Sequence, residues 1–157
     1  MNLYNFTPPS VDLLMLAPAG MVFWTGVVAF LMMMFQKRKN NAAVVIVSGV
    51  GLIGALYSLI AQFGAPEGTT LAGMVLRDRT SLLLQVALVV ICFVSVLISE
   101  SYLRHKRINF TEFYPLALWA TGGAMIMVST TNLLMMFVGL EVLSVALYIM
   151  AGMCRYE

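Results

Sequence analysis

Charged residues are scarce in this chain, at 10% of its 157 residues, whereas a soluble domain carries about a quarter. Hydrophobic residues make up 61%, and the mean hydropathy is +0.94. This composition excludes an ordinary water-soluble domain. Nine Lys and Arg against seven Asp and Glu give a net charge of only +2, so the chain has no broad basic surface and nucleic acid is not expected as a partner.

Metal-ligating residues are equally few. The two cysteines, Cys92 and Cys154, lie far apart in apolar sequence, without the paired spacing of zinc, iron–sulfur or haem sites. The single histidine, His105, sits in a basic cluster that is better explained as a solvated loop. The Gly49, Gly51 and Gly54 pattern lies within an apolar run with no strand before it, so it fails as a dinucleotide motif. We therefore expect no metal or cofactor on this chain.

Long apolar stretches are what the chain has in abundance. They cover residues 13–36, 40–66, 80–99 and 113–140, and after Glu141 the chain stays uncharged through residue 154. One crossing of a bilayer needs roughly 20 such residues, so the last stretch is long enough for two. The sequence predicts an all-α polytopic membrane protein, a single segment over residues 1–157. Its five transmembrane helices are expected at about 11–35, 43–63, 81–103, 113–129 and 133–153.

Local signals mark the ends of these helices. Asp12 is a candidate N-cap for the first helix, and residues 130–132 (Thr-Thr-Asn) form a tight turn before the last. The connection over residues 64–79 is expected to be a loop, with a short extended or interfacial piece at 71–76. The first nine residues contain no Lys or Arg, so the first apolar run is not expected to be a cleaved signal peptide.

The distribution of basic residues predicts the orientation in the membrane, because cytoplasmic loops are enriched in Lys and Arg. In the five-helix arrangement only Arg77 and Arg79 fall on one side. The other side receives Lys37, Arg38, Lys39, Arg104, Lys106, Arg107 and Arg155. The N-terminus is thus expected outside and the C-terminus inside, in a cell inner membrane or in an organelle inner membrane if the source is eukaryotic.

One residue within the spans demands an explanation. Glu141 lies eight positions after Leu133, roughly 12 Å into the last span, and a charge there costs about 2.5–3.5 kcal/mol on insertion scales. Ser144 and Tyr148 fall within about 60° of it on a helical projection. We expect this polar stripe to face other helices or water.

Two readings of Glu141 remain open on the residues alone. Intramembrane acids are usually functional, and a carboxyl in a low-dielectric position can load and release protons. The alternative is a protonated glutamate that hydrogen-bonds across a helix interface as packing. No Lys, Arg or His lies inside the five spans to partner it.

The segment over residues 112–157 resembles a known family, subunit N of the proton-pumping NADH-quinone oxidoreductase, respiratory complex I. That family carries a "GLE-L-S---Y" pattern, matched here by Gly139, Leu140, Glu141, Leu143, Ser144 and Tyr148. Residues 74–103 resemble the family's third helix and its approach, with Asp78 at the acidic position. The first two spans agree only in hydropathy and order.

This resemblance implies a membrane subunit of an oxidoreductase enzyme. Glu141 would be the mid-membrane acid of a proton half-channel, supported by Ser144 and Tyr148, with lysine partners on later helices absent here. NADH, FMN, iron–sulfur clusters and quinone would be bound by other subunits. The partners would be the other antiporter-like and small membrane subunits, together with lipid.

The family has about fourteen helices, so we expect this chain to be the N-terminal third of a longer subunit. The main alternative is a subunit of a multisubunit cation/proton antiporter, driven by gradients without electron transfer. A small drug/proton antiporter fits less well, because such proteins resemble four short helices with the acid in the first. A structural fragment without function also stays open.

Overall fold

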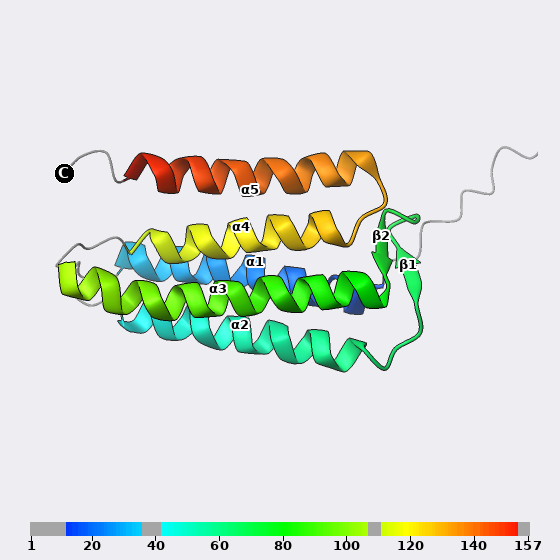
Figure 1. Ribbon diagram of the computed structural model, residues 1–157, viewed down its shortest axis with the longest axis horizontal. Coiled ribbons are helices and arrows are strands. Elements are labelled where there is room, and N and C mark those ends of the chain that lie inside the picture. The colour runs from blue at the N-terminus through cyan, green and yellow to red at the C-terminus, as the bar shows by residue number, and fades with distance from the viewer. Residues whose placement is uncertain (1–11, 36–41, 107–110, 154–157) are drawn as a thin grey trace, which may run out of the picture.

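Five helices and one small hairpin make up the computed structural model, which describes residues 12–35, 42–106 and 111–153. The elements are α1 (Leu13–Phe35), α2 (Ala42–Gln62), β1 (Gly68–Thr70), β2 (Val75–Arg77), α3 (Arg79–Lys106), α4 (Phe113–Val128) and α5 (Leu133–Met153). The helices run side by side along the long axis, with the hairpin at one end (Figure 1). The predicted all-α polytopic fold is confirmed.

Four of the helices, α1, α2, α3 and α5, are long and apolar enough to cross a membrane. The fourth predicted span exists as α4 but is only 16 residues long, about 24 Å at 1.5 Å per residue. It ends at Val128 because the following residues are tied to the hairpin. The helix therefore stops short of the length of its neighbours.

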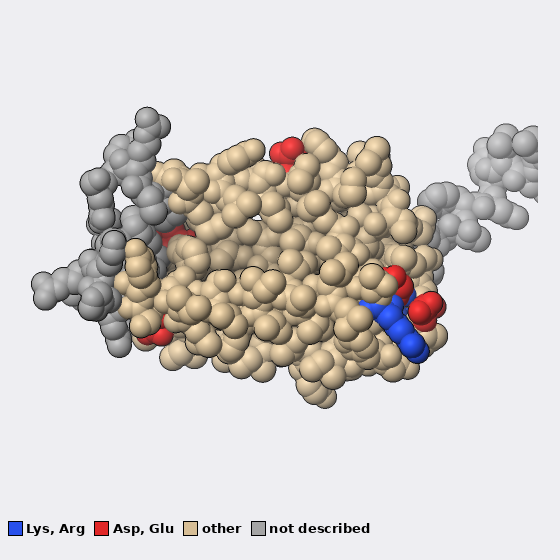
Figure 2. Space-filling view, in the orientation of Figure 1, with Lys and Arg blue, Asp and Glu red and all other residues tan. Residues whose placement is uncertain are grey.

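The centre of the bundle lies among α1, α2, α3 and α4. Each of these helices packs on two or more of the others, whereas α5 packs mainly on α4. Fully buried side chains from all four form one core, among them Val22, Leu52, Leu59, Val96, Tyr114, Leu118 and Met125. Large apolar side chains also cover the outside of the bundle, as expected where the surrounding medium is lipid. Figure 2 shows that blue and red atoms gather at the hairpin end, while the long face is almost uncharged.

The hairpin lies in the connection between α2 and α3, at one end of the bundle. There it contacts the residue before α1 and the turn between α4 and α5. Its strands pair antiparallel, with Gly68 opposite Arg77, and Arg77 donates two hydrogen bonds to the carbonyl of Pro66. The expected extended piece at 71–76 is partly wrong. Leu71, Ala72 and Gly73 all have positive φ and form the turn, so only Val75 and Leu76 of that stretch are strand.

The predicted N-cap at Asp12 is confirmed, and Asn132, predicted only as part of a tight turn, is also a cap. The Asp12 carboxylate accepts the backbone N–H of Leu14 at 3.0 Å, as an N-cap does. Asn132 caps α5 in the same way. The predicted cytoplasmic clusters at residues 37–39 and at Arg107 and Arg155, and the second cysteine, Cys154, lie outside the described residues. Cys92 is a buried free thiol.

Candidate functional site

The position of the candidate site depends on the close contact between α4 and α5 at Gly123 and Gly139. A β-carbon built on Gly139 would come within 2.8 Å of the carbonyl oxygen of Gly123, and one built on Gly123 would come within 2.7 Å of the carbonyl oxygen of Gly139. Real β-carbons do not approach a backbone this closely, so only glycine fits at either position. The two helices therefore touch backbone to backbone at this crossing, as small residues allow in membrane bundles.

This crossing fixes which face of α5 meets α4. At about 100° per residue, Leu143 and Ala146 lie within about 40° of Gly139, whereas Glu141 lies about 160° away from it. Ala146 is 3% exposed, and the backbone N of Leu143 lies beside Gly123. The Glu141 side chain is exposed on the opposite side.

The three predicted site residues share that outer side of α5. Tyr148 is 75% exposed, and Ser144 is partly exposed, with its hydroxyl donating to the carbonyl of Leu140 at 2.6 Å. That bond stays within α5, so Ser144 does not serve as a hydrogen-bond donor to Glu141 here. The stripe was expected to face other helices or water; the other four described helices do not cover it, and what lies against it stays a prediction.

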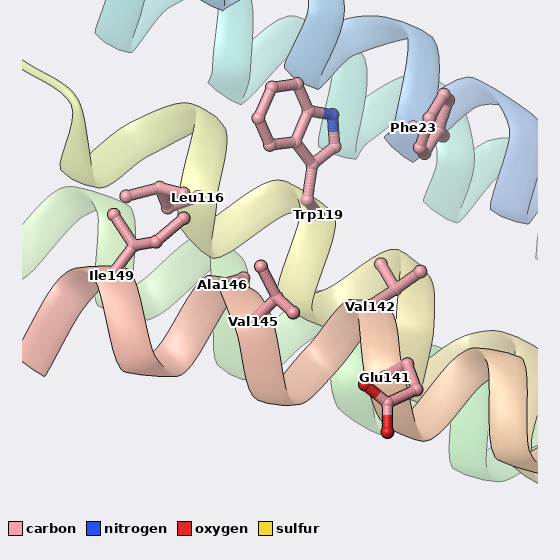
Figure 3. A pocket seen from close by; sticks show the side chains of 8 residues that line it. All are labelled: Phe23, Leu116, Trp119, Glu141, Val142, Val145, Ala146 and Ile149. Carbon is pink, nitrogen blue, oxygen red and sulfur yellow. The ribbon is translucent and has the colours of Figure 1, made fainter.

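A groove runs beside the acid, between α1, α4 and α5. It measures about 440 Å³ and is walled by Phe23, Leu116, Trp119, Glu141, Val142, Val145, Ala146 and Ile149. In Figure 3, Val142 and Val145 point from α5 toward α4, whereas the carboxylate of Glu141 points away from Trp119 and Phe23. Glu141 therefore lies at the rim of the groove, and its carboxylate is directed out of it.

Sequence reasoning did not predict that Trp119 would be part of this region. Its ring contacts Phe23 and Phe30 on α1, with ring centroids 6.4 Å and 5.7 Å apart. Its indole nitrogen is buried without a hydrogen-bond partner and faces the open backbone of Gly26. Trp119 lies in an apolar run, seven residues after the nearest charged residue, Glu112, so the sequence gives no signal that it will lie beside the helix that carries Glu141.

The acidic residue at the start of α3 has a different role. Asp78 accepts hydrogen bonds from the hydroxyl and the backbone N–H of Ser81, and these bonds, the hydroxyl foremost, lower the pKa of the Asp78 carboxyl. This is an N-cap arrangement. Among the described residues, no three of His, Cys, Asp and Glu are grouped so as to hold a metal ion.

Comparison with known proteins points in one direction. No family model matches the chain. It is 32% identical over 94% of its length to the NADH-quinone oxidoreductase subunit N of Chloroflexus aggregans, and 30% identical over 97% to subunit N 1 of Herpetosiphon aurantiacus. It is also 37% identical over 68% of its length to the NAD(P)H-quinone oxidoreductase subunit 2 of a Synechococcus strain. The chain spans about 30% of the length of the first two relatives.

Proposed function

Because the chain belongs to the subunit N family of NADH-quinone oxidoreductases, we propose that it is part of a membrane subunit of such an enzyme and supplies Glu141 to a path for protons. The chain matches relatives more than three times its length. We propose accordingly that it forms about a third of a longer subunit, and that the remaining helices complete the path.

One observation carries this proposal: a carboxyl group lies in the middle of α5, on the face that the other four helices leave open. A charged or protonated acid is expensive at this depth. It lies about 160° from the Gly123 and Gly139 contact, and its stripe neighbour Ser144 bonds within its own helix. Packing between the five helices therefore gives no reason for an acid here, which weakens the reading of Glu141 as interhelical glue.

The chemistry that suits this position is protonation and release of the carboxyl. A carboxyl can exchange a proton at each change of its surroundings, because desolvation favours the neutral form and a nearby cation favours the charged form. A basic group brought near the open face of α5 would drive release, and its withdrawal would drive uptake. The five predicted spans hold no Lys, Arg or His, so we propose that the basic partner comes from another part of the subunit.

The redox chemistry is proposed to lie on other subunits, where NADH, FMN, iron–sulfur clusters and quinone would be bound. The partners are then the other membrane subunits of the complex and the lipid around them. The names of the relatives favour this over a gradient-driven cation/proton antiporter. The membrane would be a cell inner membrane, or an organelle inner membrane in a eukaryote.

The test is Glu141→Gln in the assembled complex, with Glu67→Gln as its matched control. Glu67 is exposed in the loop before β1, and its substitution removes the same charge away from the spans. Proton transport into inverted membrane vesicles, driven by NADH oxidation, is expected to fall about tenfold or more in Glu141→Gln, since a proton-transfer group typically contributes 10²–10⁴. Glu141→Asp should retain part of the rate.

Assembly is checked separately, by the amount of complex in native gels. An assembled Glu141→Gln complex that transports protons at the parental rate contradicts the proposal. If Glu67→Gln reduced proton transport as much as Glu141→Gln, the effect would come from the loss of a negative charge in general. That result would also contradict the proposal.

A further inference from the structure

We infer that Gly123 and Gly139 act as positioning residues for Glu141: their backbone contact sets the rotation of α5 that directs the carboxylate to the open face. This inference rests on the proposed function of Glu141 and deepens it. It follows from the geometry of the crossing between α4 and α5.

The contact leaves no free space on either side. A β-carbon on Gly139 would lie 2.8 Å from the Gly123 carbonyl oxygen and 3.2 Å from the backbone N of Met127. A β-carbon on Gly123 would lie 2.7 Å from the Gly139 carbonyl oxygen and 2.9 Å from the backbone N of Leu143. Side-chain atoms of Met127 and Leu143 also lie within 3.3 Å, but the carbonyl oxygens and backbone nitrogens are main-chain atoms, which no rotamer change can move away. An added methyl group must therefore shift or rotate a whole helix.

Few residues of α5 are buried against the rest of the bundle. Only 11% of its apolar stretch is buried inside the bundle, compared with 22–33% for the corresponding stretches of the other three long helices. Its outer side presents large apolar side chains, including Leu134 at 72% exposure and Phe137 at 56%, beside the stripe of Glu141, Ser144 and Tyr148. Because apolar side chains lie on both the buried and the exposed sides, hydropathy gives α5 little preference for one rotation. The glycine pair supplies that preference.

A small rotation at the crossing becomes a large displacement at the acid. The carboxylate of a glutamate stands several ångströms from its helix axis, so a rotation of about 10–20° moves it by about 1–2 Å. Misplacement by about 1 Å is enough to cost roughly 10²-fold in a reaction that depends on geometry. Glu141 is only two residues from Gly139, so it follows any rotation of α5 at that point.

The structure offers closely matched controls. Gly122 is the buried neighbour of Gly123 on α4, and a β-carbon there would meet nothing within 4 Å. Gly152 lies on α5 with the same open surroundings. Gly122→Ala and Gly152→Ala therefore make the same chemical change, glycine to alanine within the same two helices, without a steric demand on the crossing.

The experiment measures the state of Glu141 directly, and not only transport. Assembled complexes carrying Gly139→Ala, Gly123→Ala, Gly122→Ala or Gly152→Ala are treated with dicyclohexylcarbodiimide, a lipophilic reagent that modifies protonated carboxyls. The modified peptide containing Glu141 is quantified by mass spectrometry across a pH series. In Gly139→Ala and Gly123→Ala we expect the rate of modification of Glu141 to change at least threefold, or the midpoint of its pH dependence to move by at least half a pH unit. The two controls should stay within twofold of the parent.

A second variant keeps the test decisive if the alanine variants do not assemble. Leu143→Ala shortens the side chain beside Gly123 and cannot create a clash, so it loosens the crossing without overpacking it. Its control, Leu134→Ala, makes the same truncation on the exposed face. A change of at least twofold in Glu141 modification in Leu143→Ala alone supports positioning.

The two proposals fail in different ways. Modification profiles that match between Gly139→Ala and Gly122→Ala, or between Leu143→Ala and Leu134→Ala, overturn the positioning role even if Glu141→Gln abolishes transport. Parental transport in Glu141→Gln overturns the proton role of Glu141, whatever the glycine variants do to its reactivity.

Discussion

Leu76 donates its backbone N–H to the carbonyl oxygen of Ser129 across 2.7 Å, and this bond ties the hairpin to the turn between α4 and α5. Thr130 adds a second link, since its hydroxyl donates to the carbonyl of Met74 at 2.5 Å and accepts the backbone N–H of Asn132 at 3.1 Å. The turn that starts the acid-bearing helix is therefore held by a segment more than fifty residues earlier in the chain.

We predict that Thr130→Val loosens this junction. Valine has the same shape but leaves the Met74 carbonyl and the Asn132 amide without their partner, at a cost of about 1–2 kcal/mol. Hydrogen–deuterium exchange at the Leu76 amide should accelerate, and the free energy of unfolding in detergent should fall. Thr131→Val is the control: it removes one longer bond, 3.2 Å to Gly73, from an exposed residue. Equal effects from the two variants would contradict this prediction.

Asp78 makes the stability of the hairpin end depend on pH. The hydrogen bonds from Ser81 lower the pKa of Asp78 in the folded chain, so the folded state favours the ionised form. The resulting stability is fully present above the ordinary carboxyl pKa of about 3.9, and it is lost as the pH falls through the lower, folded-state pKa.

Asp78→Ala is therefore expected to cost about 1 kcal/mol at pH 7, as for loss of an N-cap. The gap between parent and variant should narrow as the pH drops below 4. Unfolding in detergent micelles between pH 7 and pH 3 measures this. Ser81→Ala should weaken the pH dependence, because it removes the hydroxyl that contributes most to the lowered pKa. A gap that stays constant down to pH 3 is the contrary result.

The contact between Gly26 and Trp119 yields a prediction for the α1–α4 interface. A β-carbon on Gly26 would lie 2.6 Å from the indole nitrogen, and the ring is already held between Phe23 and Phe30. Gly26→Ala should destabilise the bundle by about 1–3 kcal/mol through overpacking. Gly20→Ala, also in α1, meets nothing within 4 Å and should be neutral or slightly stabilising. Thermal unfolding followed by tryptophan fluorescence compares the two, and a higher midpoint for Gly26→Ala than for Gly20→Ala would refute the assignment.

The sequence predicted the helices well because each signal is local. Runs of apolar residues, the Asp12 cap and the turn at Thr130 each depend on a few neighbours, and the structure places all of them as expected. The position of Glu141 eight residues into α5 is likewise a matter of counting. These features can be predicted without knowing which helices pack against each other.

Features that depend on packing could not be read in advance. Apolar side chains lie on both the buried and the exposed sides of α5, and its polar stripe does not face α4, so the sequence did not tell which face of α5 meets α4. The close backbone approach at Gly123 and Gly139 is visible only once the two helices are brought together. The turn at residues 71–73, within the expected extended piece, was missed for a related reason. Leu71 and Ala72 adopt positive φ, which residues with side chains rarely do, so an extended segment was the more natural expectation.

The orientation in the membrane remains a prediction and can be tested at described residues. Thr69 is exposed in β1 at the hairpin end, and Glu112 lies before α4 at the other end of the bundle. Because seven of the nine Lys and Arg fall on the side of Glu112 in the five-helix arrangement, that side should remain in the cytoplasm or its organellar equivalent.

Single-cysteine variants measure this directly, in a background with Cys92→Ala and Cys154→Ala. A membrane-impermeant maleimide should label Thr69→Cys in intact cells and Glu112→Cys only in inverted vesicles. The opposite pattern would place Arg77 and Arg79 inside. The three-residue basic cluster at 37–39 would then have crossed the membrane, against the charge bias that normally retains it. Labelling of both variants from the same side would contradict a helix count in which α1, α2, α3, α4 and α5 alternate in direction.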